Sequence, residues 1–515
     1  MSDGTVSNLC DRFLVAFGAL HEQRVPALKA AMAEGYWLHI DATCDRGKGG
    51  LFVCLDGWRG WVLLAARIPS ENGETLRPLV AKTVAMFGDP IATVRDLGDA
   101  GGKAVAPLRE RGITDLLCHF HFLAAVGGKL FDKPYMRLRS RLRTLRVKGD
   151  LCGVLAELHR YRRTSGYAGR FGRGEVCKEL ISAVLWAVDD DGRKPPTYPF
   201  SLPLLDCVRR CQEAPDRARR WVPNPRSDVE NAVIRYLNRL ASSLRRDQAI
   251  TNAVQQLEES WAPFCELRDV LRLSNSDLSL HQDSHVKQAT LPDLELVLLH
   301  QIEDALTQHG IDLRKQQPTV GKRDSRFCPQ SIIVDYLNRY GPQLVGHPAL
   351  RDESGRALAV VDRTNNVAEC FFSQAKQSLR RRVGRAVLGR DMEQQPAQVA
   401  LVRNLLKPDY VRVLCGSLED LPRALAEVYS ALPETPQLVR SNRNTEVLST
   451  LRSLLQYDQQ SLRHLPSGPD LPPPPNSRLR HSSPLDNVDG APSNNPQQLP
   501  ARDPATSTQT ASPAP

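Results

Sequence analysis

The stretch Trp37-Leu38-His39-Ile40-Asp41-Ala42-Thr43 carries one acidic residue at the end of a short apolar run, just before polar and glycine-rich residues. This order is typical of a buried strand that ends in a carboxylate. Two further acids are candidate partners of Asp41, because Asp96 closes the run 91–95 and Glu369 stands at the start of a helix-like segment. Hard divalent cations such as Mg²⁺ take oxygen ligands and occupy phosphoryl-transfer sites with few carboxylates. Asp41, Asp96 and Glu369 are therefore predicted to be catalytic acids that hold a pair of metal ions.

The segments after Asp41 predict an α/β domain. The pair Asp56-Gly57 separates the apolar run 51–55 from a second run over 58–68, which is a strong β-hairpin signal. Helical spacing over 72–87, the strand that ends at Asp96, a helix over 101–111 and a strand over 113–117 follow. The resulting order, βββαβαβ, is that of the ribonuclease H fold. In that fold the first and fourth strands are neighbours, so Asp41 and Asp96 are expected to meet, and a returning helix is expected to deliver Glu369.

Four sequence blocks together resemble the DDE transposases with a ribonuclease H-like core, specifically enzymes of bacterial insertion sequences related to the mutator-like elements. The blocks are residues 39–43, 94–97, 118–123 and 363–372. In the family a Cys-x-x-His pair follows the fifth strand, as Cys118 and His121 do. The last acid stands in an Asn-Asn-x-x-Glu context, as Asn365, Asn366 and Glu369 do. The resemblance implies that these Cys, His and Asn residues form a structural core motif and that His121 contacts DNA.

The chain is expected to consist of an interrupted core with additions. Residues 1–35 form a helical lead-in that Pro26 breaks or kinks. The mixed-sheet core occupies 36–132 and resumes, with C-terminal helices, over 359–465. A large all-helical insertion over 133–358 separates the two parts, with helical patterns at 151–161, 176–188, 229–244, 253–267 and 294–306. Residues 466–515 are rich in Pro and Ser and are predicted to be a disordered tail.

The basic composition favours a nucleic-acid partner. The chain of 515 residues carries a formal net charge of +10, although a solvated basic surface gives the same excess. Downstream of Glu369, a basic series at helical spacing is predicted to bind DNA, and it comprises Lys376, Arg380, Arg381 and Arg382. The basic segment 137–146 has two open interpretations, either a face that follows a phosphate backbone or an ordinary solvated helix face.

Other features are assigned structural roles or exclude function classes. Twelve cysteines occur without a Cys-x-x-Cys pair, and no apolar stretch reaches the length of a membrane span. No secretory signal is visible, so a cytoplasmic protein is expected, and the resemblance implies a bacterial one that associates with the nucleoid through DNA. No zinc site is assigned, because no second pair with finger spacing follows Cys118 and His121. Asp99, three residues after Asp96, competes with it for the place of the second acid, and Asp96 is preferred because it directly closes the apolar run. Further residues assigned to packing, turns or loops are Cys207, Cys211, Asp45 and Asp56.

The predicted function is that of a DDE transposase that cleaves DNA at element ends and transfers the strands into target DNA. Two Mg²⁺ ions about 3.5–4 Å apart, with Mn²⁺ as a substitute, would serve the reaction. The resemblance further implies a homo-oligomer on paired ends and no membrane partner. One alternative is a truncated or repurposed DNA-binding descendant without catalysis, since family members usually carry an N-terminal end-reading module that residues 1–35 do not supply. The other is a two-metal ribonuclease H-like nuclease.

Overall fold

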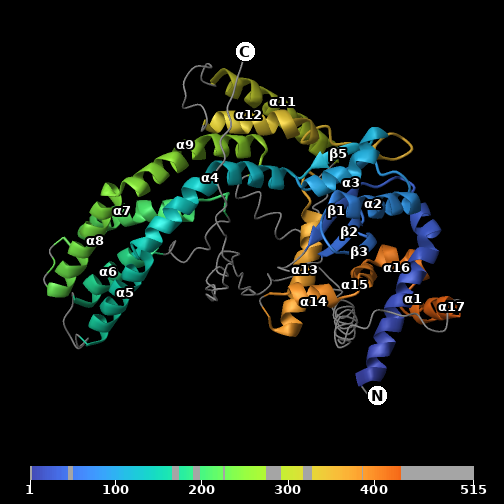
Figure 1. The fold of residues 1–515 in the computed structure, drawn as a ribbon, viewed down its shortest axis with the longest axis horizontal. Helices are drawn as coiled ribbons and strands as arrows, with labels where there is room; N and C mark the ends of the chain where they lie inside the picture. Colours follow the sequence, from blue (N-terminus) through green and yellow to red (C-terminus); the bar gives the residue numbers. More distant parts are fainter. Residues whose placement is uncertain are drawn as a thin grey trace, which may run out of the picture. The chain divides into compact units, whose positions relative to one another are not determined.

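The computed structural model describes residues 3–43, 50–164, 173–188, 198–223, 225, 227–273, 292–316, 328–385 and 387–430. Within these ranges the chain is a mixed α/β structure that combines a five-stranded mixed sheet with many helices (Figure 1). Asp45 and the predicted tail over 466–515 lie outside the described residues. No helix in the described part is both long enough and apolar enough to cross a membrane.

The large sheet has the strand order β3-β2-β1-β4-β5. β1 pairs antiparallel with β2 and parallel with β4, and β4 pairs parallel with β5. Two helices connect the later strands, so the predicted order βββαβαβ and the pairing of the first strand with the fourth are both confirmed. The bounds are β1 Leu38–Thr43, β2 Gly50–Asp56, β3 Val62–Ile68, α2 Gly73–Phe87, β4 Ala92–Arg95, α3 Asp99–Glu110 and β5 Thr114–Leu117.

The turn between β2 and β3 follows from the chemistry of Asp56 and Gly57. Asp56 is fully buried, accepts a hydrogen bond from the Trp58 backbone at 2.9 Å, and pairs with Arg59 at 3.1 Å. A Cβ atom on Gly57 would lie 1.8 Å from Trp37 Nε1, so only glycine fits there. The assignment of Asp56 to a structural turn is confirmed.

Side chains alternate between two faces of the sheet. Leu38 and Ile40 of β1 belong to a large core that also contains buried residues of α2 and α3. On the other face, Val94 and Leu116 pack in a smaller core with Leu350. The helix α13, Asn366–Val383, contacts β1 and β2. Asn365, the residue before this helix, hydrogen-bonds to His39 of β1, which lies on the same face as Val94.

The N-terminal helix and the C-terminal helices pack together beside β3. α1, Asp3–Ala30, contacts α15, α16 and α17, and His21 of α1 lies 2.7 Å from the Tyr410 hydroxyl and 3.0 Å from the Leu63 carbonyl. The helix continues through Pro26, so of the two expected effects of Pro26, a break or a kink, the break does not occur. The C-terminal bounds are α14 Gly389–Gln394, α15 Gln398–Val402, η3 Arg403–Leu406, α16 Pro408–Cys415 and α17 Leu421–Tyr429.

A separate hydrophobic core lies among the helices that follow β5. All five helical patterns predicted in this region correspond to helices. α4 runs without a break through the predicted boundary at 132/133. The bounds are α4 His119–Thr144, α5 Val147–Thr164, α6 Arg173–Val188, α7 Pro203–Trp221, α8 Asp228–Arg246, α9 Gln248–Val270, α11 Pro292–Gln316, α12 Pro329–Tyr340 and η2 Gly341–Gln343.

The expectation of an all-helical segment up to residue 358 is wrong at its end. β6, Ala349–Arg351, and β7, Ala357–Val360, form an antiparallel hairpin there. Asp352 makes the turn, because its side chain accepts hydrogen bonds from the backbones of Ser354 and Arg356, and Gly355 supplies the positive φ of 84°. Strands of three and four residues are too short for an alternating pattern to be recognised in the sequence.

Candidate metal centre

Asp41 and Asp96 lie on one face of the sheet, just past the paired part of β1 and β4. The register pairs His39 with Val94, and each acid follows two residues later on its own strand. Because side chains alternate along a strand, both carboxylates lie on the face occupied by His39 and Val94. β1 does not end at Asp41 as predicted but continues to Thr43 along β2. Its pairing with β4 nevertheless stops before Asp41, so the acid lies where the two parallel strands have separated.

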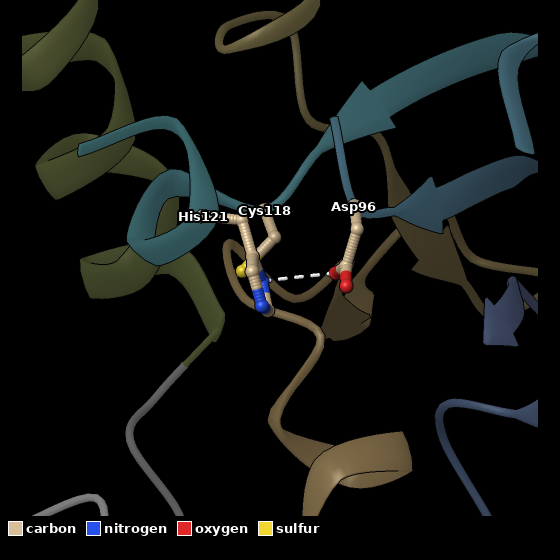
Figure 2. A group of neighbouring side chains, drawn as sticks. All are labelled: Asp96, Cys118 and His121. Carbon is tan, nitrogen blue, oxygen red and sulfur yellow. Dashed lines mark ion pairs between the residues drawn. The ribbon is translucent and has the colours of Figure 1, made fainter. Parts of the chain in front are cut away.

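Cys118 extends this row of side chains across a third strand. Val94 pairs with Leu116 of β5, and Cys118 follows two residues later, directly before α4. In the described part of the chain, one group of three potential metal ligands has its ligand atoms all within 4.8 Å of one another, namely Asp96, Cys118 and His121. Figure 2 shows Cys118 and His121 side by side at the start of α4, with the Asp96 carboxylate directed toward them.

Glu369 joins this group from far along the chain. It stands in the first turn of α13, and its Oε1 atom lies 3.4 Å from His121 Nδ1. The same nitrogen lies 2.9 Å from Asp96 Oδ1, so His121 stands between two of the predicted acids. The side chains of Asp96, Glu369 and His121 are 35%, 41% and 30% exposed, which leaves the group open to solvent.

A chain of hydrogen bonds through buried side chains holds the Asp96 carboxylate in place. The Asn365 amide nitrogen donates to Asp96 Oδ1 at 3.2 Å, and the Asn365 amide oxygen accepts from His39 Nδ1 at 2.8 Å. The other ring nitrogen of His39 lies 3.1 Å from Asp362 Oδ2, which also accepts from the Trp37 indole at 3.0 Å. His39 and Asn365 are fully buried, so both are fixed by these partners.

A second support reaches the backbone of Asp96. Arg95 donates from Nε and Nη2 to the two carboxylate oxygens of Asp115, each at 2.9 Å, and from Nη1 to the Asp96 carbonyl at 2.9 Å. Thr93 and Gln343 donate to the same Asp115 carboxylate at 3.0 and 2.7 Å. This buried ion pair ties β4 to β5 directly beneath the site.

Sequence reasoning assigned no role to His39, Asp362 or the Arg95–Asp115 pair. His39 could have been found by alternation, since it lies two residues before Asp41 and so on the same face of the strand. No sequence pattern pairs His39 with Asp362, which lies 323 residues away, or Arg95 with Asp115, which lies 20 residues away.

The electrostatics of the group reflect crowded carboxylates. Burial and the nearby Asp96 carboxylate raise the pKa of Asp41 to about 8. Burial also raises the pKa of Glu369, against the effect of His121 and together with that of Asp96. For His121, burial alone lowers the pKa, but the Asp96 carboxylate and the Cys118 side chain raise it to about 11. His121 is therefore a cation that lies between the carboxylates of Asp96 and Glu369.

This donor set fits divalent cations. Carboxylate oxygens of Asp41, Asp96 and Glu369 are the ligands that Mg²⁺ takes, and a cation among them would relieve the repulsion that raises the pKa of Asp41. Asp41 and Glu369 lie outside the tight group within 4.8 Å, so the three acids surround a wider space than Asp96, Cys118 and His121 do. His121 lies between Asp96 and Glu369, where such a cation would bind, so the His121 ring would have to move aside when the cation binds.

The predicted basic residues follow Glu369 along the same helix. Arg380 and Arg381 are exposed, and Lys376 and Arg382 are half-buried. All four lie in α13, with Lys376 and Arg380 spaced so that they share the face of Glu369. DNA binding by this series, which we call the α13 basic series, stays a prediction.

Other predicted positions lie away from the acids. Asp99 begins α3 with its side chain 81% exposed, whereas Asp96 belongs to the group, in agreement with the preference for Asp96. In the basic segment 137–146, Arg141 forms an ion pair with Asp247 at 2.6 Å, which joins α4 to the start of α9. Cys207 and Cys211 lie on one helix and pack against the preceding helix, as expected.

Neither a known protein-family model nor any curated protein matches the chain.

Proposed function

We propose that this chain is a DDE transposase with a ribonuclease H-like core that cleaves and joins DNA strands with the help of divalent metal ions. The observation that carries the proposal is the meeting of Asp41, Asp96 and Glu369. Asp41 lies in β1 and Asp96 directly follows the adjacent parallel strand β4, on the same face of the sheet. The helix α13 brings Glu369 Oε1 to within 3.4 Å of His121 Nδ1. In the strand order β3-β2-β1-β4-β5, β2 alone runs antiparallel to its neighbours, whereas β1, β4 and β5 pair in parallel. This arrangement supports the ribonuclease H-like assignment.

Asp41, Asp96 and Glu369 would hold Mg²⁺, which when bound activates a water or a 3′-hydroxyl and stabilises the leaving oxygen of a phosphodiester. Asn365 and Arg95 contribute by fixing Asp96, one through its carboxylate and the other through its backbone carbonyl. His121 supplies positive charge beside the acids and can contact a phosphate oxygen at the same place.

The α13 basic series would bind the DNA backbone next to the acids. Arginine and lysine contacts to phosphate fix the register of a duplex without reading its sequence. Because the series lies on the same helix as Glu369, a duplex bound along α13 would have one strand at the acids. The proposed partners are the element ends and the target DNA, with a homo-oligomer of the chain on paired ends.

The test is cleavage and joining of DNA that carries the flanking ends of the chain's own genomic locus, in Mg²⁺ or Mn²⁺. We expect the unmodified chain to produce nicked and joined products, and Glu369→Gln to bind the DNA but to produce neither. The matched control is Glu353→Gln, which makes the same change at an exposed position in the turn between β6 and β7 and should keep full activity.

Different products separate the competing functions. Nicking without joined products would assign the chain to the metal-dependent nucleases. Tight DNA binding with no metal-dependent products from the unmodified chain would overturn catalysis and leave a DNA-binding descendant.

A further inference from the structure

We propose that Asp96, Cys118 and His121 form a distinct binding site for one thiophilic divalent cation, of which Zn²⁺ is the type. A thiolate, an imidazole and a carboxylate are the ligands that Zn²⁺ takes in proteins, whereas Mg²⁺ takes oxygen alone. The donor chemistry of these three residues therefore differs from that of the three acids, although Asp96 belongs to both sets.

The geometry is close to that of a bound ion. The three ligand atoms lie within 4.8 Å of one another, and His121 Nδ1 and Asp96 Oδ1 are 2.9 Å apart. Ligand atoms around a tetrahedral Zn²⁺ lie roughly 3.3–3.6 Å apart, as follows from metal–ligand bonds of about 2.0–2.3 Å. Side-chain shifts of about 1 Å would thus complete the site (Figure 2).

The positions of the ligands are set by rigid elements. The Cys118 backbone donates to the Arg95 carbonyl at 2.8 Å, which fastens the end of β5 to the residue before Asp96. His121 is in the first turn of α4, one turn along from Cys118. Cys118 and His121 therefore approach the ion from one side, and Asp96 approaches from the adjacent strand.

Carboxylates beside the imidazole favour a cation at this place. His121 Nδ1 lies 2.9 Å from Asp96 Oδ1 and 3.4 Å from Glu369 Oε1. A metal ion that binds Nδ1 would replace the proton on this nitrogen, which passes to the buffer together with the proton of the Cys118 thiol. Three protein ligands leave a fourth position for water, and the partly exposed side chains of Asp96 and His121 leave that position open to solvent.

Sharing of Asp96 makes the two kinds of metal exclude one another. An ion held by Asp96, Cys118 and His121 withdraws the Asp96 carboxylate from the set that would hold Mg²⁺. Zn²⁺ is therefore expected to inhibit Mg²⁺-dependent cleavage at concentrations far below those of Mg²⁺. This inhibition rests on the proposed function, but the binding of the thiophilic ion does not.

Binding is tested on the full chain by titration with Cd²⁺, followed through the ultraviolet absorption of the cadmium–thiolate bond. The Cys118 thiol gives up its proton to the buffer when this bond forms. We expect a band that saturates at one equivalent in the unmodified chain. Cys118→Ala should lose the band. His121→Gln should keep the band but bind Cd²⁺ more than about tenfold more weakly, because even residues that only hydrogen-bond to a metal ligand change metal affinity by about tenfold or more.

The control is Cys370→Ser, which removes the thiol of the residue directly after Glu369 and should leave the band unchanged. Circular dichroism shows which variants fold. If Cys118→Ala does not fold, His121→Gln alone decides, because its side chain is 30% exposed and tolerates the change. A band that persists at full strength in Cys118→Ala, an unchanged affinity in His121→Gln, or loss of the band in Cys370→Ser would overturn the site.

Competition separates this inference from the proposed function. Micromolar Zn²⁺ added to a cleavage reaction in millimolar Mg²⁺ should suppress cleavage in the unmodified chain. A chain that shows the cadmium band but never cleaves DNA would disprove the proposed function and leave the thiophilic site standing. A chain that cleaves DNA without a cadmium band and without inhibition by Zn²⁺ would disprove the site alone.

Discussion

Asn365 is expected to stabilise the fold through its hydrogen bond to His39 and to hold the Asp96 carboxylate in place. Asn365→Leu, a change to a side chain of similar size, removes the 2.8 Å contact to His39 and the 3.2 Å contact to the Asp96 carboxylate. Because His39 is fully buried, its Nδ1 atom would lose its partner without gaining water. Such a group costs roughly 1–3 kcal/mol, and a bond to a charged acceptor contributes roughly 1.5–3 kcal/mol. The change should therefore lower the free energy of unfolding by about 2–4 kcal/mol.

A double-mutant cycle measures the coupling directly. His39→Phe removes the same contact from the other side, so the double variant should be less destabilised than the sum of the single variants by roughly 1–2 kcal/mol. Urea unfolding followed by circular dichroism supplies the free energies. The control is Asn338→Leu on α12, which removes an exposed hydrogen bond from Arg314 and should change the free energy of unfolding by less than about 1 kcal/mol. Additive effects of His39→Phe and Asn365→Leu would refute the coupling.

Three further predictions concern other parts of the site. Asp115→Ala leaves the buried Arg95 guanidinium without its partner and should cost about 3–5 kcal/mol in urea unfolding, whereas a surface-like effect below about 1 kcal/mol would contradict this role. The pKa of Asp41 is about 8 in the folded chain and 3.8 in the unfolded one, so the free energy of unfolding should fall as the pH rises from about 4 to 8. Asp41→Asn should be more stable than the unmodified chain by a few kcal/mol at pH 8 and equally stable at pH 4. Arg381→Gln should weaken DNA binding and reduce the slope of log affinity against log salt by about 1, and an unchanged slope would remove Arg381 from the DNA-binding surface.

The sequence predicted the parts of the fold that depend on local patterns. Asp56-Gly57 marked the hairpin correctly because the turn needs a buried carboxylate acceptor and a residue without Cβ. The strand order then sufficed to place Asp41 next to Asp96. His39 pairs with Val94 on the parallel strand, and each acid follows two residues after its paired residue, so the two acids lie close together.

Features that depend on contacts between distant segments could not be predicted. The hairpin at 349–360 has strands too short to alternate, and Pro26 is accommodated in a helix that packs against the C-terminal helices. His121 was predicted to touch DNA, and its position between Asp96 and Glu369 follows only from the meeting of α4 and α13 at the sheet. The support of Asp96 by Asn365 and His39 likewise joins residues that no local pattern connects.

We propose that Asp41, Asp96 and Glu369 hold divalent metal ions, and one measurement tests this directly. The most direct measurement is anomalous X-ray scattering from crystals of the chain grown with Mn²⁺, which replaces Mg²⁺ at oxygen sites. We expect manganese peaks in contact with carboxylate oxygens of all three residues, and their loss in Asp41→Asn. Saturating Mn²⁺ with no peak among these carboxylates, or with peaks that remain in Asp41→Asn, would contradict it.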